Sequence, residues 1–139
     1  MIQVVVEFTW KHVGAVVLDE SDALRFPVVP AAAGLYKFTI GDGVYIGEAA
    51  YLQRRMQHYR TPGPNQKTNR RMNQLMVKHL GADGKIGLDI ASEAVVAVDG
   101  VRRDADLDSK SERVLVEHAA IVAVVEAGTT CLNRAIGSA

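Results

Sequence analysis

The sequence predicts a single α+β domain, in which a small central antiparallel or mixed sheet is flanked by helices. Valine-rich runs that predict strands occur near the N-terminus and again in the second half of the chain. Segments with a helical spacing of apolar residues lie between and after these runs, which favours a mixed architecture. The 139 residues, nearly half of them hydrophobic, suit one domain with a conventional core.

The first half of the chain carries two strand predictions. Residues 2–8, IQVVVEF, alternate loosely and predict an extra N-terminal strand, whereas residues 11–33 follow no clear pattern. The stretch GLYKFTIGDGVYIG at 34–47 predicts a hairpin. Two β-rich runs flank GDG there, and glycine allows the positive φ that short hairpin loops require.

Three segments predict helices. Residues 48–59 place Leu52, Met56 and Tyr59 at spacings of four and three, as a buried helical stripe requires. A break rich in proline and glycine follows. A second helix is predicted at residues 70–80, where Gly81 ends it, and two strands at 85–90 and 93–98. The strongest helix prediction is at residues 109–127.

Cysteine content and hydropathy bear on the compartment. The single cysteine, Cys131, excludes a disulfide framework and is typical of a reducing compartment. The N-terminus lacks the basic segment and long apolar stretch of a signal peptide, and no apolar run reaches the roughly 18 residues of a transmembrane helix. We therefore expect a soluble, cytoplasmic protein without a membrane partner.

The charges are balanced in number but separated along the chain. The formal net charge is zero, which alone argues against a strong nucleic-acid binder. From Arg54 to His79, however, the sequence has seven lysines and arginines and no acidic residue. A stretch of this kind predicts either a basic face that attracts polyanions or an ordinary solvated helix surface.

An ordered set of short motifs runs through the chain. It consists of GLY at 34–36, YIG at 45–47, Arg55, Tyr59, Glu117 and Asn133. This set resembles the GIY-YIG nuclease family over about residues 34–134. The resemblance implies a GIY-YIG-like fold for the whole single domain of residues 1–139. Its core is then about 34–134, and residues 1–33 form an extension that we expect to add a strand or a dimer surface.

The resemblance also implies a function, a metal-dependent DNA endonuclease that hydrolyses phosphodiester bonds. It implies that Glu117 is the only protein ligand of Mg²⁺ or Mn²⁺, with phosphate oxygens and waters completing the shell. The catalytic residues that it implies are Tyr36, Tyr45, Arg55, Tyr59 and Glu117. The supporting residues are Gly47, His58 and Asn133, of which His58 participates less than Tyr59.

The two tyrosines of the hairpin can be interpreted without the resemblance. Tyr36 and Tyr45 lie on neighbouring strands and share one face of the sheet if their positions have matching parity. A tyrosine has an unperturbed pKa of about 10, so Tyr36, the preferred base for water, needs a nearby cation to lower it. The alternative is that both tyrosines are ordinary core residues with satisfied hydroxyl groups.

Arg55 and Tyr59 are four residues apart and so share one face of the first predicted helix. A guanidinium at the edge of the core can grip two phosphoryl oxygens at once, which a lysine cannot do with the same geometry. We therefore expect Arg55 to stabilise the charge of the pentacovalent transition state. Arg54 is expected to be solvated or to position a phosphate, outside the catalytic set.

Glu117 shares a helical stripe with Val114 and Ile121, so it lies on or beside a buried face. An acid there needs a partner, either a divalent cation or a salt bridge to Arg55. Asn133 is expected either to hold the active-site backbone by hydrogen bonds or to be a simple turn residue.

The basic segment around residues 60–80 predicts a DNA contact, because it combines cations for phosphates with amides that can reach base edges. Neutralising about five phosphates would give a log–log salt slope near −4 to −5. We expect low intrinsic sequence specificity on duplex or branched DNA, unless a homodimer or a partner protein supplies it. The predicted DNA-binding residues are Arg54, Arg60, Gln66, Lys67, Asn69, Arg70 and Arg71.

One departure from the family leaves other functions open. Relatives often carry a lysine directly after the second motif, where this chain has Glu48. This favours an alternative, a catalytically weak or inactive DNA-binding module of the same fold, as part of a repair or restriction complex. A third hypothesis is a protein-interaction domain that uses the apolar N-terminal segment.

Overall fold

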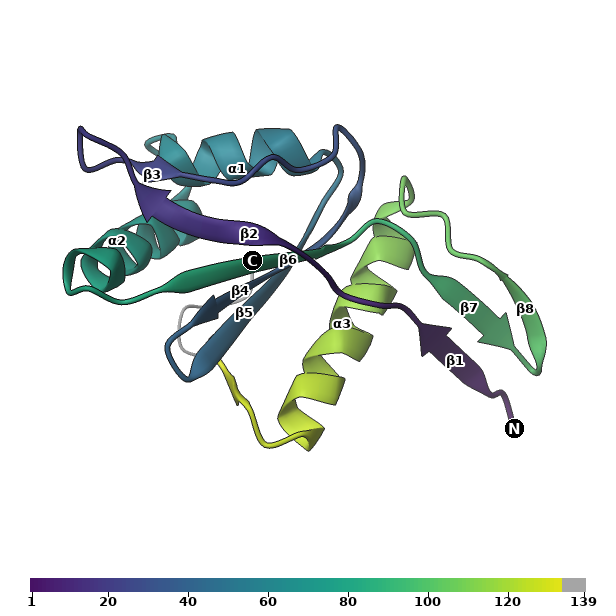
Figure 1. The fold of residues 1–139 in the computed structure, drawn as a ribbon. Coiled ribbons are helices and arrows are strands. Elements are labelled where there is room, and N and C mark those ends of the chain that lie inside the picture. Colours follow the sequence, from purple (N-terminus) through teal and green to yellow (C-terminus); the bar gives the residue numbers. More distant parts are fainter. Residues whose placement is uncertain (134–139) are drawn as a thin grey trace.

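The structure, a computed structural model, describes residues 1–133 as three helices and two β-sheets (Figure 1). The helices are α1 (Leu52–Arg60), α2 (Lys67–Gly81) and α3 (Lys110–Glu126). In this part of the chain, no helix is both long enough and apolar enough to cross a lipid bilayer.

The larger sheet has six strands in the order β3-β2-β6-β4-β5-β9. Its neighbours are antiparallel except for β5 and β9, which are parallel. The strands are β2 (Lys11–Leu18), β3 (Leu24–Arg25), β4 (Gly34–Ile40), β5 (Gly43–Ala49), β6 (Ile86–Ala91) and β9 (Thr130–Cys131).

A smaller sheet of three strands, in the order β1-β7-β8, projects beside α3 (Figure 1). Its strands are β1 (Val4–Glu7), β7 (Val95–Val98) and β8 (Val101–Asp104). The pairing of β2 with β6 continues into the pairing of β1 with β7, so one bent antiparallel ribbon links the two sheets. Asp99 and Gly100 close the hairpin of β7 and β8 with φ values of 48° and 83°.

The predicted hairpin is formed by β4 and β5, and its register meets the parity condition for the two tyrosines. Tyr36 pairs with Gly47 and Phe38 with Tyr45, so both tyrosines lie on the same face of the sheet. Gly41 has a φ of 58° in the two-residue loop, the conformation for which glycine is favoured.

The helices cover opposite faces of the larger sheet (Figure 1). On one face, α1 and α2 pack against the side of β4 that carries Tyr36 and Phe38, together with Leu88 of β6. On the other, α3 covers Leu35 and Ile46 through a separate apolar cluster. The two clusters are the two halves of one core, with the hairpin between them.

Three details differ from the sequence predictions. Residues 11–18, which showed no pattern, form β2 in the interior of the larger sheet, with a register shift between His12 and Gly14. Gly14, whose φ is 142°, bends the strand there and breaks the alternation of side chains. The first helix begins at Leu52 rather than residue 48, because β5 continues to Ala49, and α2 begins at Lys67, ahead of residue 70.

Candidate active site

Three tyrosines come together on the face of the sheet that α1 covers. Tyr36 of β4 and Tyr59 of α1 share a hydrogen bond of 2.6 Å between their hydroxyl groups, and their rings meet edge to face. Both residues are 1 % exposed, and Tyr45 of β5 is 4 % exposed. Tyr45 interacts electrostatically with the other two hydroxyl groups, so the cluster joins two strands and a helix.

Gly47 is required for this arrangement because the ring of Tyr36 lies directly over it. A Cβ atom at position 47 would lie 2.2 Å from both Cζ and Oη of Tyr36, far inside any ordinary contact. The glycine therefore leaves room for the phenol over β5. This gives Gly47, predicted as a supporting residue, a steric role.

Arg55 reaches the cluster from α1, where it lies one turn before Tyr59. Its Nη1 donates a 3.1 Å hydrogen bond to the hydroxyl oxygen of Tyr36. Burial alone would lower the pKa of Arg55, but its interactions with Tyr36 and Tyr59 outweigh burial and raise that pKa. The guanidinium is therefore a fixed positive charge beside the phenols.

The electrostatic environment keeps the phenols protonated. Burial raises the pKa of Tyr36, although the charge of Arg55 opposes this effect. Burial likewise raises the pKa of Tyr59 and brings the pKa of Tyr45 to about 12. The lowered tyrosine pKa that the basic sequence suggested is therefore not present, because desolvation exceeds the effect of one arginine.

Glu117 lies at the same place, from the opposite face of the sheet. Its side chain is 17 % exposed and interacts electrostatically with Tyr36, Tyr45 and Arg55. Burial, and secondly the charge of Glu48, raises the pKa of Glu117. Residues predicted from four separate segments of the sequence thus converge on one site.

The ion pair between Glu117 and Arg55, one of the two expected partners for this acid, does not form within residues 1–133. The nearest basic nitrogen among these residues is Nε2 of His118, at 3.6 Å from Oε1 of Glu117. The same residues contain no group of three His, Cys, Asp or Glu side chains that could hold a metal ion. Glu117 can therefore offer a cation one partly buried carboxylate.

Glu48, where relatives of the resembled family often carry a lysine, is paired with two cations of α3. Its Oε2 accepts a 2.6 Å hydrogen bond from Nε of Arg113, and its Oε1 lies 3.2 Å from Nζ of Lys110. These two bonds lower the pKa of Glu48 although burial raises it. Sequence reasoning missed both cations, although an acid next to a buried strand residue signals that a partner is needed.

Asn133 is 4 % exposed and is bonded to the backbone of β5. Its Oδ1 accepts from the amide of Ile46 at 2.9 Å, and its Nδ2 donates to the carbonyl of Ile46 at 2.6 Å. The side chain thus continues the pairing of β9, whose own backbone pairs with Gly43 and Val44. Of the two expected roles of Asn133, these bonds correspond to holding the backbone by hydrogen bonds rather than to a simple turn residue. His58, the remaining supporting residue, is half-buried and takes no part in these bonds.

The predicted DNA-binding residues divide into two groups. Arg54, Lys67, Arg70 and Arg71 are exposed on α1 and α2, and Arg54 lies over the ring of Tyr51. The other three residues are half-buried. Arg60 binds Asp19 at 2.9 Å and the carbonyl of Leu24, and Oε1 of Gln66 accepts from Gly63 and Asn69 ahead of α2. Arg60, Gln66 and Asn69 each hold a loop through these bonds, and their contacts with DNA stay predictions.

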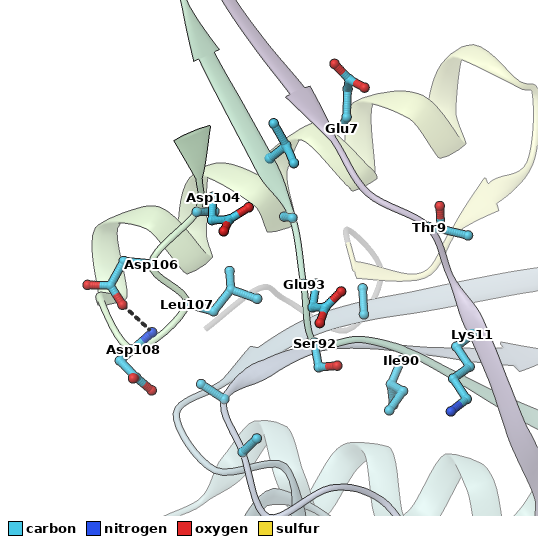
Figure 2. A pocket seen from close by; sticks show the side chains of 16 residues that line it. Glu7, Thr9, Lys11, Ile90, Ser92, Glu93, Asp104, Asp106, Leu107 and Asp108 are labelled. Atoms are coloured by element: carbon cyan, nitrogen blue, oxygen red, sulfur yellow. Dashed lines mark hydrogen bonds between the residues drawn. The ribbon is translucent and has the colours of Figure 1, made fainter. Parts of the chain in front are cut away.

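A large pocket lies elsewhere, between the two sheets and the loop before α3 (Figure 2). It has a volume of about 730 Å³, and the charged residues of its lining are five acids and one cation, Lys11. None of the tyrosines, Arg55 or Glu117 lines it. Its acidic lining would repel DNA phosphates, so it is distinct from the candidate site.

Comparisons with known proteins support the fold. No family profile and no curated protein matches the chain by sequence. Among solved structures, a mutant of bacteriophage T4 EndoII is similar, with a TM-score of 0.56 and 17 % sequence identity over 77 % of this chain and 84 % of EndoII. The predicted α+β class and GIY-YIG-like fold are confirmed by the similarity of this structure.

Proposed function

We propose that this protein is a divalent-metal-dependent DNA endonuclease with a GIY-YIG-type site. The observation that supports it most is the convergence of three tyrosines, Arg55 and Glu117 on one place in a fold shared with a phage endonuclease. The combination of a fixed guanidinium, buried hydroxyl groups and a lone carboxylate suits phosphodiester chemistry.

In this proposal a water molecule attacks the phosphorus, and Tyr36 is the preferred base that takes its proton. A Tyr36 phenolate would accept hydrogen bonds from Arg55 and Tyr59, which already contact its oxygen. Because burial raises the pKa of Tyr36, these two donors do not suffice, and a cation held by Glu117, when bound, would supply further positive charge. Tyr45 assists, and Tyr59 orients Tyr36.

The transition state carries additional negative charge on its phosphoryl oxygens. Arg55 has one Nη atom on Tyr36, and its remaining N–H groups can grip those oxygens. Uncatalysed phosphate ester cleavage is among the slowest biological reactions, so one arginine is insufficient. Mg²⁺ or Mn²⁺, when bound, would act as a Lewis acid on the same oxygens.

The residues present fit such an ion as a site with one protein ligand. Glu117 has no strong ion-pair partner among residues 1–133, and its raised pKa indicates that its negative charge is poorly compensated there. Carboxylate oxygen is the ligand that Mg²⁺ and Mn²⁺ prefer, and Mg²⁺ usually keeps several waters. DNA phosphate oxygens and water would supply the rest of the shell.

The exposed cations of α1 and α2 are the proposed DNA contact. Arg54, Lys67 and Arg70 lie on helices that follow directly from the hairpin. The amides of Gln66 and Asn69 are bonded within the protein, which leaves phosphate contacts rather than base contacts to dominate. We therefore propose low intrinsic sequence specificity on duplex or branched DNA.

A second candidate is a DNA-binding module that has lost activity or retains little. Two observations favour it: the raised pKa of Tyr36, and the presence of Glu48 where relatives often have a cation. This candidate predicts DNA binding that survives chelation and no cleavage with any divalent metal.

The two candidates are separated by incubating supercoiled plasmid with Mg²⁺ or Mn²⁺. We expect the wild-type protein to nick the plasmid, and Glu117→Gln and Arg55→Ala each to lower the rate by about 100-fold or more while the circular dichroism is unchanged. Glu126→Gln, at the exposed end of α3, and Arg102→Ala, on the exposed strand β8, are matched controls that keep the rate. Full cleavage by Glu117→Gln would refute the mechanism, and an inert wild-type protein that binds DNA would favour the second candidate.

A further inference from the structure

Arg113 is a buried arginine on the first turns of α3. Its exposure is 5 %, and within residues 1–133 the buried polar residues are Arg113 and Asn133. Its Nε donates to Glu48 of β5 at 2.6 Å, and its Nη1 donates to the carbonyls of Leu107 and Asp108, each at 3.0 Å. One guanidinium thus joins the end of β5, the loop before α3, and α3 itself.

A buried ion pair of this kind needs an explanation other than stability. The side chains of Arg113 and Glu48 are 6 % and 11 % exposed, and taking both charges out of water offsets much of their attraction. Apolar residues of similar volume would stabilise the contact at least as well. The charged pair adds geometric specificity, because its hydrogen bonds form in only one relative position of α3 and β5.

The apolar contacts of α3 are not directional. The fully buried apolar side chains of the helix are Val116 and Ala120, and Ile121 and Val124 are partly buried against the same cluster. Burial of apolar surface does not by itself select one position of a helix on a sheet. The hydrogen bonds of Arg113 do select one.

Both ends of the pair lie next to residues of the candidate site. Glu48 follows Gly47, over which the ring of Tyr36 lies. Arg113 precedes Glu117 by four residues, one helical turn or about 6 Å along the axis. A shift of α3 against β5 would therefore move the Glu117 carboxylate relative to the phenols and Arg55.

The pair also decides which carboxylate is available. Glu48 and Glu117 are close enough for the charge of one to raise the pKa of the other. Both oxygens of Glu48 are engaged, one by Arg113 and one by Lys110. Glu117 is left as the carboxylate that can receive a cation.

We propose that Arg113 is a positioning residue of the candidate site, which through its bond to Glu48 fixes α3 on β5 and so places the Glu117 carboxylate at the tyrosine–arginine cluster. This inference rests on the proposed function. It concerns residues that touch neither the reacting atoms nor the cation.

The test compares Arg113→Met with Arg103→Met. Arg103 also pairs with a glutamate of α3, Glu112 at 2.6 Å, but from the exposed strand β8. The first readout, which needs no activity, is binding of Mn²⁺ to the protein, followed by the loss of the electron paramagnetic resonance signal of free Mn²⁺. The second is the Mn²⁺ concentration that half-saturates plasmid nicking, and the third is the dissociation constant for DNA.

We expect Arg113→Met to weaken Mn²⁺ binding and raise the half-saturating concentration by about tenfold, as loss of residues that orient metal ligands typically does. The dissociation constant for DNA should stay within about twofold, and Arg103→Met should resemble the wild-type protein in every readout. If Arg113→Met does not fold, Arg113→Lys and Glu48→Gln take its place, because each keeps a polar partner and loses the bonded geometry.

Folded variants of both Arg113 and Glu48 with wild-type Mn²⁺ binding and half-saturation would overturn the positioning role. Nicking by the wild-type protein would leave the proposed function intact in that case. A wild-type protein that neither binds Mn²⁺ nor nicks DNA would overturn the proposed function, and this inference with it.

Discussion

Replacing Gly47 with alanine tests whether the tyrosine cluster needs the glycine of the hairpin. The new methyl group would lie 2.2 Å from both Cζ and Oη of Tyr36, whereas ordinary contact begins near 3.4 Å. The ring must therefore withdraw by more than 1 Å, and its hydrogen bonds to Tyr59 and Arg55, at 2.6 and 3.1 Å, cannot both survive.

The cost can be worked from these contacts. Overpacking a core costs about 1–3 kcal/mol, and each lost buried hydrogen bond adds about 1 kcal/mol. We expect Gly47→Ala to lower the free energy of unfolding by about 2–4 kcal/mol, since part of the network can relax. Nicking should fall at least 100-fold, because Tyr36 and Arg55 lose their relative position.

Urea unfolding gives the free energy, and Gly87→Ala is the matched control. Gly87 is also a strand glycine of the larger sheet, but the nearest atom to its added Cβ is 3.6 Å away, so the change should stay within about 1 kcal/mol. The double variant Gly47→Ala/Tyr36→Leu replaces the ring with a smaller side chain. It should recover part of the stability but no activity, because the effects of substitutions at two contacting residues are coupled. A Gly47→Ala protein with wild-type stability and nicking would refute the steric argument.

Three further predictions concern stability. Asn133→Ala leaves the amide and carbonyl of Ile46 without their partner and should lower the free energy of unfolding in urea by about 2 kcal/mol, whereas a change below about 0.5 kcal/mol would show that water replaces the side chain. Hydrogen bonds from the Ala23 amide and from Arg60 lower the pKa of Asp19 below 3.8, so the ionised carboxylate stabilises the fold above that pH. This stabilisation is lost as the pH falls through the pKa of Asp19 in the folded state. Melting temperatures of wild type and Asp19→Asn should therefore differ at pH 6 and converge as the pH falls below 3.8; a constant difference would contradict the assignment. Burial and Glu48 raise the pKa of Glu117 above 4.5, so its ionisation destabilises the metal-free fold, and in EDTA at pH 8 Glu117→Gln should melt above the wild type, with the gap closing near pH 4. A lower melting temperature for that variant would mean that Glu117 has a partner in the fold.

Local patterns predicted the hairpin and the part of the site that depends on it. The GDG loop set the register of β4 and β5, and the register places Tyr36 and Tyr45 on one face because side chains alternate. The four-residue spacing of Arg55 and Tyr59 likewise places them together on α1. Glu117 could be located because its stripe on the last helix is regular over several turns.

Contacts between distant segments could not be predicted in the same way. Arg60 pairs with Asp19, and Arg113 with Glu48, across 41 and 65 positions of the chain. Nothing in the local sequence of Arg60 separates a cation that holds a loop from one that meets DNA. The strand β2 escaped detection because Gly14 interrupts the alternation on which strand prediction depends.

The bent ribbon that joins the two sheets has a consequence for how the chain reaches its native state. Val4 pairs with Val98 and Lys11 with Ile90, so β1 and β2 leave the ribosome long before their partners exist. Closing such large loops slows folding, and a valine-rich segment is prone to aggregation until its partner strands pair with it. We therefore expect the rate of refolding to be limited by the pairing of residues 86–98 with β1 and β2. We also expect deletion of residues 1–33 to yield insoluble protein rather than a smaller working domain.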